Sequence, residues 1–155
     1  MSHLPVQLVE ATKAHVPQLM SWFPTEHSCR IWGGPEFRFP FTAETFRADC
    51  HLELPSWVML DGRGVLCGFG QYYLRAGRCH LARLVIAPAH RGRGLGTELI
   101  DRLAQAGRAA LGVEHCSLFV SSANPSAMAL YQRLGFAPSD QPADPTLPGA
   151  RYMIR

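Results

Sequence analysis

The hydrophobic positions of this chain follow two spacings, one that alternates and one that repeats at helical intervals. Alternation over residues 4–10 predicts a first strand, and Thr12 is placed to cap a short helix that ends at about residue 20. Thr42 is placed to cap a second helix that runs to about residue 51. Between these helices, residues 22–41 combine aromatic side chains with Gly and Pro, which predicts a structured loop.

Strand patterns dominate the middle of the chain. Residues 57–60 and 65–74 flank a turn at 61–64, so we expect them to form a hairpin. A second turn at 76–77 leads into a further strand at about 79–87. Three neighbouring antiparallel strands are therefore predicted.

The last third predicts two helices, each between strands. Hydrophobic residues recur at helical spacing from Leu95 to Ala110, and Gly112 ends that run. After a strand at 114–120, Asn124 is placed as the N-cap of a helix that ends near Gly135.

Final strands are expected from Phe136 onward and at 151–154, on either side of a proline-rich surface loop at 142–148. At 155 residues and 47% hydrophobic residues, we expect one domain spanning 1–155. The N-terminus lacks a basic segment followed by an apolar run, and no stretch of about 18 apolar residues occurs. We therefore expect a cytoplasmic protein with no membrane partner.

The amino-acid composition limits the kinds of site and partner that the chain can have. The five cysteines are scattered and the seven histidines do not cluster, so neither a disulfide framework nor a metal site is indicated. The net charge is +3, and nearly all cationic side chains are arginine. No aromatic-basic interleaving that would stack bases is visible, so nucleic acid is the least favoured partner. Arginine also suits the phosphate groups of a small ligand.

A glycine-rich segment offers a place for such a ligand. The strand that ends at Ile86 runs into Arg91-Gly-Arg-Gly-Leu-Gly and then directly into the long helix. Backbone N–H groups at a helix start lack intrahelical partners and attract anions, and glycines let a diphosphate approach the main chain. Neither the P-loop nor the Rossmann pattern is present. The segment predicts a nucleotide-like cofactor, and an ordinary tight turn is the alternative.

Two segments together carry a family resemblance. The spacing Arg91-x-x-Gly94-x-Gly96 and the later Asn124-Pro-Ser-Ala-Met-Ala-Leu-Tyr131 resemble the signature segments of the GNAT superfamily of acyl-CoA-dependent N-acetyltransferases. The resemblance covers roughly residues 80–137. It implies a mixed α/β (α+β) fold: a central, mostly antiparallel, twisted sheet of about seven strands flanked by about four helices.

The resemblance also implies where acetyl-CoA binds as co-substrate. The pantetheine arm would pair, like an added strand, with Leu84, Val85 and Ile86. The loop and helix start would hold the diphosphate, through Arg91, Gly92, Arg93, Gly94, Leu95, Gly96 and Thr97. Asn124 would approach the cofactor, or serve only as an N-cap. Tyr131 would donate a proton to the leaving thiolate, unless it is a core tyrosine.

The general base is less defined. Some relatives carry a glutamate on the strand before the asparagine, where this chain has Phe119. His80 is the best local substitute, because imidazole has a suitable pKa and strand alternation would aim it at the cleft; a surface histidine is the alternative. Glu26 and Glu36 could bind or deprotonate an amine, although solvated carboxylates are the simpler interpretation.

The acceptor pocket is predicted from aromatic and basic side chains. Trp22, Trp32 and Phe37 would form its walls, or else anchor the loop. Arg83 would hold an acceptor carboxylate, or point outward.

The resulting hypothesis is transfer of an acetyl group from acetyl-CoA to the primary amine of a small molecule by direct attack. Protein or peptide N-acetylation and a non-catalytic acyl-CoA sensor are the alternatives. The resemblance allows a homodimer, although no residue pattern specifies an interface.

Overall fold

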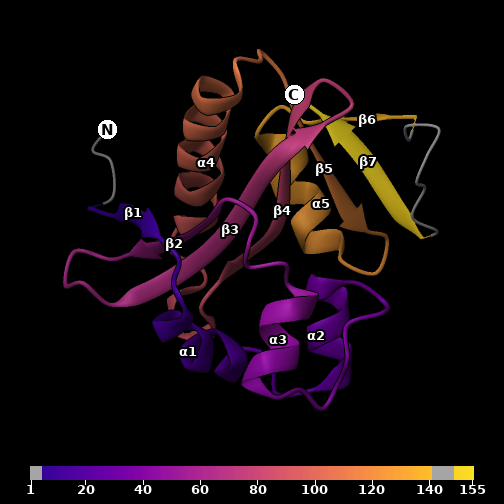
Figure 1. The fold of residues 1–155 in the computed structure, drawn as a ribbon. Coiled ribbons are helices and arrows are strands. Elements are labelled where there is room, and N and C mark those ends of the chain that lie inside the picture. Colours follow the sequence, from indigo (N-terminus) through magenta and orange to yellow (C-terminus); the bar gives the residue numbers. More distant parts are fainter. Residues whose placement is uncertain (1–4, 141–148) are drawn as a thin grey trace.

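The computed structural model describes residues 5–140 and 149–155 and is built around one seven-stranded sheet (Figure 1). The strand order is β1-β2-β3-β4-β5-β7-β6. The strands are β1 (Gln7–Glu10), β2 (Ser56–Leu60), β3 (Leu66–Arg75), β4 (Arg78–Ile86), β5 (Cys116–Ser121), β6 (Ala137–Ser139) and β7 (Ala150–Ile154). The α-helices are α1 (Val16–Ser21), α2 (Glu26–Gly33), α3 (Ala43–Asp49), α4 (Leu95–Leu111) and α5 (Pro125–Arg133). The predicted mixed α/β fold and mostly antiparallel sheet are confirmed.

The helix caps largely agree with the sequence. Thr42 caps α3 and Asn124 caps α5, as predicted, while Gly112 ends α4 in a left-handed conformation. Thr12 caps a 3-10 turn at Lys13–His15, which continues into α1.

One element was predicted wrongly. Residues 22–41 were expected to be a loop, but they contain α2, which makes five α-helices among the described residues instead of four. Thr25 begins this helix with a capping box, in which its hydroxyl accepts from the Ser28 N–H at 3.0 Å. The Gly and Pro content of the segment does not interrupt this helix, because Pro24 precedes it, Gly33 is its last residue, and the others follow it.

The sheet carries one parallel contact. β4 pairs with β5 only over Cys79–Leu81 and Cys116–Leu118, whereas β4 itself continues to Ile86 and stays paired with β3. The strands separate beyond this short contact. The separation leaves one edge of β4 without a strand partner along its second half.

Each face of the sheet has its own core. On one face, the apolar side of α4 packs against β3 and β4, so closely that a Cβ on Gly107 would lie 2.5 Å from the Cys79 sulfur. On the other face, an aromatic core from α1 to α3 packs around Phe46 and Phe69, both fully buried. Figure 1 shows α1, α2 and α3 together below the sheet.

A bulge interrupts the pairing of β3 and β4. The register shifts between Phe69 and Gln71, and opposite this shift Arg83 adopts a positive φ of 50°. Left-handed backbone is rare in a non-glycine residue within a strand. The bulge changes which face each later β4 side chain occupies.

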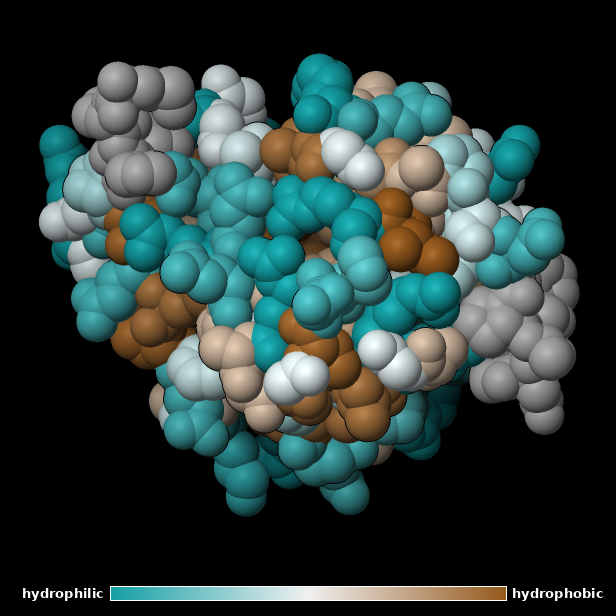
Figure 2. All heavy atoms as spheres, turned by 90° about the horizontal axis from the view of Figure 1, so that it is seen from above, coloured by the Kyte–Doolittle hydropathy of each residue, from teal (hydrophilic) through white to brown (hydrophobic). Residues whose placement is uncertain are grey.

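The surface seen in Figure 2 is mostly hydrophilic, with hydrophobic side chains in separate patches. The most exposed large hydrophobic residue described is Leu74, at 57%. Within residues 5–140 and 149–155, no helix has the length and apolar character needed to cross a membrane. The predicted proline-rich loop at 142–148 and Leu4, the first residue of the predicted strand at 4–10, lie outside the described residues.

Candidate functional site

A cleft of about 1130 Å³ opens where β4 and β5 separate. Its walls come from α2, β4, the start of α4, the end of β5 and α5. All but three of the predicted site residues line it; the exceptions are His80, Arg93 and Phe37.

The long unpaired edge of β4 forms one wall. Leu84, Val85 and Ile86 line the cleft, and Val85 and Ile86 pair on their other side with β3. A peptide-like chain of amides laid along this edge would find backbone groups that β5 does not use. The three residues predicted to bind a pantetheine arm thus lie where such an arm would fit.

The start of α4 closes one end of the cleft. Gly94 is the N-cap in a left-handed conformation, with a φ of 77°, and no side chain caps the helix. Gly96 and Thr97 line the cleft beside it, so first-turn N–H groups face the cleft without a side-chain partner. The 17-residue helix adds its dipole at that end. This arrangement fits a diphosphate.

The arginines of the loop differ in position. Arg91 lines the cleft, and its Nε donates to the Ile86 carbonyl at 3.2 Å. Arg93 was predicted to bind the cofactor, but it is exposed and lies outside the cleft lining. The chain turns at the positive-φ residues Gly92 and Gly94 on either side of it.

α5 forms the opposite wall. The Asn124 Oδ1 accepts from the Ala127 N–H at 3.2 Å, so Asn124 is an N-cap that also lines the cleft. Tyr131 lies in the cleft lining, and burial raises the pKa of its hydroxyl to about 12. The hydroxyl therefore keeps its proton throughout the neutral range. Further residues of α5, missed by the sequence analysis, lie on the same helical face: Ser126, Leu130 and Arg133.

The aromatic wall comes from the first third of the chain. Trp22 and Trp32 line the cleft as predicted. Phe37 does not: it is 2% exposed and packs against Trp32 and Phe46 in the aromatic core. α2 also brings in His27 and Ile31, which were not predicted as site residues because this helix was not predicted. The Thr25-x-x-Ser28 cap was the signal that could have found them.

Arg83 is the one cation that β4 places in the cleft. Its carbonyl accepts from the indole Nε1 of Trp32 at 2.9 Å, and its Nη1 donates to the Gln71 Oε1 at 2.9 Å. Burial lowers the pKa of the guanidinium, which nevertheless stays charged at neutral pH. Its Nε is buried and meets no acceptor among the described residues.

His80 lies outside the cleft lining, contrary to the prediction that alternation would aim it inward. It is 2% exposed, its Nδ1 lies 2.9 Å from the Ser117 Oγ, and its ring contacts Phe119 and Tyr152. Burial, and then the charges of Arg75 and Arg83, lower the pKa of its imidazole to about 3. Such an imidazole is neutral but a very weak base, so its position and basicity do not support the predicted role.

No Asp or Glu occurs among the described residues that line the cleft. Glu26 forms an ion pair with Arg30, and Glu36 is exposed. No group of metal-ligating side chains occurs in the part of the chain that the structure describes. The described cleft is therefore apolar and basic.

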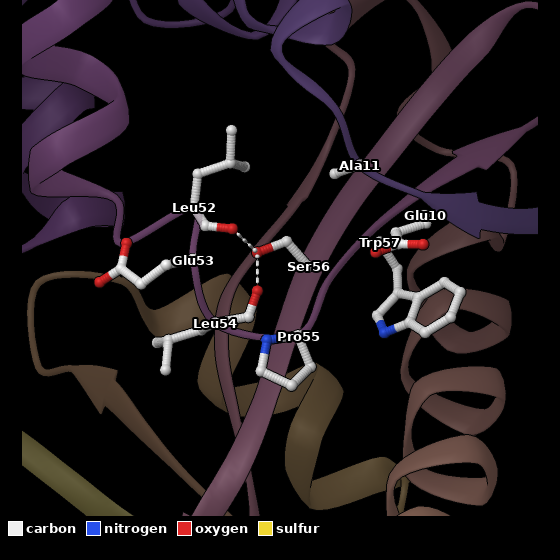
Figure 3. Close-up of a pocket in the computed structure, with 8 residues that line it drawn as sticks. All are labelled: Glu10, Ala11, Leu52, Glu53, Leu54, Pro55, Ser56 and Trp57. Carbon is white, nitrogen blue, oxygen red and sulfur yellow. Dashed lines mark hydrogen bonds between the residues drawn. The ribbon is translucent and has the colours of Figure 1, made fainter.

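A smaller hollow of about 360 Å³ lies between the end of β1 and the start of β2 (Figure 3). Ser56 lies at its centre, with its hydroxyl donating to the Leu54 carbonyl at 2.8 Å. Glu10 and Glu53 lie on opposite sides of it in this view. None of the predicted site residues lines this hollow.

Comparison with known families gives one match over most of the chain. The sequence profile of the Acetyltransferase (GNAT) family matches residues 18–136. The matched region contains every element that lines the cleft.

Among curated proteins, the chain is 36% identical over 131 residues to N-alpha-acetyltransferase MAK3 of Arabidopsis thaliana. The alignment covers 81% of this chain and 63% of that protein, so the chain spans less than two thirds of its relative's length.

Solved structures share the fold. A spermidine N-acetyltransferase from Vibrio cholerae, in complex with CoA and spermine, superposes with a TM-score of 0.74 at 18% identity, over 97% of this chain and 94% of that one. An acetyltransferase from Thermus thermophilus gives a TM-score of 0.72 at 26% identity, over 100% and 99% of the two chains.

Proposed function

Because this chain belongs to the GNAT family of acetyltransferases, we propose that it transfers an acetyl group from acetyl-CoA to the primary amine of a small molecule by direct attack. The observation that carries the proposal is the cleft, in which a free strand edge, an uncapped helix start and Tyr131 face one space. In the reaction the amine nitrogen bonds to the thioester carbonyl carbon, the C–S bond breaks, and an amine proton leaves for the sulfur.

Separate parts of the cleft would hold the two ends of the cofactor. The edge of β4 would hold the pantetheine amides, and the N–H groups after Gly94 would hold the diphosphate. Holding donor and amine in one cleft supplies proximity, which accounts for much of the catalysis of such bimolecular reactions.

Tyr131 would act at the sulfur. With a pKa of about 12 it stays protonated, so it can donate a hydrogen bond to the thiolate as the C–S bond breaks. A thiol has an ordinary pKa near 8.5, so complete proton transfer from this tyrosine to the sulfur would be uphill. The net proton on the departing thiol would therefore come from the amine, with Tyr131 stabilising the charge in between.

The site would receive the amine in its neutral form. No carboxylate lines the described cleft. His80 would not act as the base, because its imidazole is buried outside the lining and has a pKa of about 3. A low dielectric lowers the pKa of a bound amine, because it disfavours the charged form. The apolar walls of the cleft supply this condition.

A peptide α-amine is the second candidate acceptor. The 36% identity to an N-alpha-acetyltransferase favours it. A bulky aromatic wall and the absence of a glutamate at Phe119 are the reasons to prefer a small acceptor. A single domain over residues 1–155, a cytoplasmic location and a homodimer stay predictions from the sequence.

The direct test is thiol release from acetyl-CoA by the purified protein, with amino acids, polyamines, aminoglycosides and short peptides as acceptors and with product masses measured. We expect release above background with one class of small amine. Release only with peptides would move the second candidate to the front. Binding of acetyl-CoA without release for any acceptor would contradict the proposed function and favour an acyl-CoA sensor.

A further inference from the structure

Arg83 is held in the cleft by buried structure rather than left to solvent. Gln71, which is fully buried, directs its Nε2 at the Cys50 carbonyl, the His51 carbonyl and the Ser56 Oγ, at 2.8, 3.1 and 2.9 Å. These acceptors fix which end of the amide is the donor, so its Oε1 must face Arg83. The guanidinium is therefore positioned by a polar network that begins at the smaller hollow of Figure 3.

The backbone at Arg83 is also constrained. Its φ of 50° lies in the left-handed region, and its carbonyl is held by the Trp32 indole. A non-glycine residue in this region is strained, and such strain persists only where the surrounding structure imposes it. Backbone strain of this kind is found most often at active sites and ligand-binding sites, which fits a ligand-binding role for Arg83.

The guanidinium is charged, partly desolvated and has donors to spare. Arginine carries five N–H donors, and here one of them meets the neutral Gln71 amide. No described carboxylate forms an ion pair with Arg83. Its Nε is buried without an acceptor among the described residues. A partly buried cation without an ion-pair partner among the described residues carries a desolvation cost, and an anionic ligand would offset that cost.

The other charged side chains that line the described cleft are also positive. Arg91 and Arg133 line it, and no described Asp or Glu does. A polyamine brings several positive charges and needs carboxylates to balance them. A planar carboxylate instead matches the fork of a guanidinium.

Resting on the proposed function, we propose that the acceptor is an amino-acid-like molecule whose carboxylate is bound by Arg83 while its amine attacks the thioester. Arg83 is then the residue that determines acceptor specificity. The charge of the carboxylate would be met within the cleft, and spermidine would be a poor acceptor despite the fold shared with spermidine N-acetyltransferases.

The test compares each standard amino acid with its own amide, which lacks the α-carboxylate. Because the amide also has a less basic α-amine, each kcat/KM is expressed per neutral amine. For the preferred amino acid, we expect a kcat/KM about 10- to 100-fold above that of its amide, the range for a hydrogen bond to a charged group. Arg83→Gln should reduce that ratio to about threefold or less while leaving the KM for acetyl-CoA unchanged. Arg83→Lys should recover part of the ratio, since it restores the charge without the fork.

Arg63→Gln is the matched control, because it removes the same charge from an exposed position in the β2–β3 turn. It should keep the full preference for the carboxylate. Thermal unfolding of each variant establishes that it is folded.

The outcomes separate this inference from the proposed function. If amines are acetylated but the amide is as good as the amino acid, or spermidine is better than both, the carboxylate inference is overturned and the acetyltransferase stands. Equal loss of amino acid and amide in Arg83→Gln also overturns it.

If no amine is acetylated, the proposed function fails and binding decides the inference. The deciding measurement is then titration calorimetry of the CoA-saturated protein with N-acetyl amino acids and with their amides. Carboxylate-dependent binding that Arg83→Gln abolishes supports the inference, and equal or absent binding of the two series overturns it.

Discussion

Acid should destabilise this protein through one buried imidazole, that of His80. The side chain is 2% exposed and its pKa is lowered to about 3, chiefly by burial and then by the charges of Arg75 and Arg83. An unfolded chain returns the group to about 6.5. Between these two values the unfolded state binds a proton that the folded state does not.

The linkage between protonation and folding gives the sign and size of this change in stability. A lowered folded-state pKa means that the stability is fully present above about pH 6.5 and is lost as the pH falls toward 3. Each pH unit in that window lowers the free energy of unfolding by about 1.4 kcal/mol. At pH 6.5 the unfolded imidazole is already half protonated, so from pH 6.5 to pH 4.5 the contribution of His80 is a loss of about 2 kcal/mol, a large share of the stability of a typical domain.

The assay is urea unfolding followed by tryptophan fluorescence at pH 7.5, 6.5, 5.5 and 4.5. His80→Asn keeps an amide that can hydrogen-bond with the Ser117 hydroxyl but cannot titrate. We expect its free energy of unfolding to be lower at pH 7.5, because the smaller side chain leaves a cavity. Its decline with acid should be shallower than that of the wild type by about 1.4 kcal/mol per pH unit below 6.5.

His115→Gln is the control, because His115 is exposed on the loop before β5. Its stability curve should run parallel to that of the wild type. Parallel curves for His80→Asn and the wild type would refute the reasoning, since they would mean that the imidazole accepts a proton in the folded protein.

Three further predictions concern the reaction. Tyr131→Phe should lower kcat about 10- to 100-fold and leave the Kd for acetyl-CoA within about twofold, measured by steady-state kinetics and calorimetry; equal losses in both would remove Tyr131 from the sulfur. Gly94→Val should weaken acetyl-CoA binding about tenfold or more, because valine resists a φ of 77°, whereas Gly64→Val, at a φ of 80° in the β2–β3 turn, should affect only stability. The kcat/KM should rise with pH toward the pKa of the acceptor amine, because no described carboxylate lines the cleft; a plateau that begins near pH 6.5 would instead point to a histidine base.

The elements proposed to bind phosphate were predictable because their signals are local. Gly94 and Gly112 mark the ends of α4 by their conformational freedom, and the Asn124-Pro125 pair marks the start of α5. The loop between β4 and α4 could therefore be located from sequence alone, and the family resemblance added the roles of the residues around it.

The acceptor side was less predictable because it depends on tertiary structure. A bulge at Arg83 breaks the alternation along β4, so the face on which His80 lies could not be inferred by counting back across it from Leu84, Val85 and Ile86. Phe37 and Trp32 are both aromatic residues of one segment, yet only packing decides that the first is in the core and the second is in the cleft. The role of Gln71, which positions Arg83, involves contacts with residues about 20 positions away in the chain.

The short parallel contact between β4 and β5 also bears on how the protein comes apart. The sheet has two parts, one of β1 to β4 and one of β5, β7 and β6. Only three residue pairs join them within the sheet, those of Cys79–Leu81 with Cys116–Leu118. The covalent link between the two parts of the sheet runs through α4, which packs on β3 and β4. A ligand bound along the second half of β4, where β4 and β5 are not paired, would connect the two parts of the sheet. Amide hydrogen exchange along the second half of β4 should therefore slow when CoA is added, so that donor supply tunes the rigidity of the sheet as well as turnover.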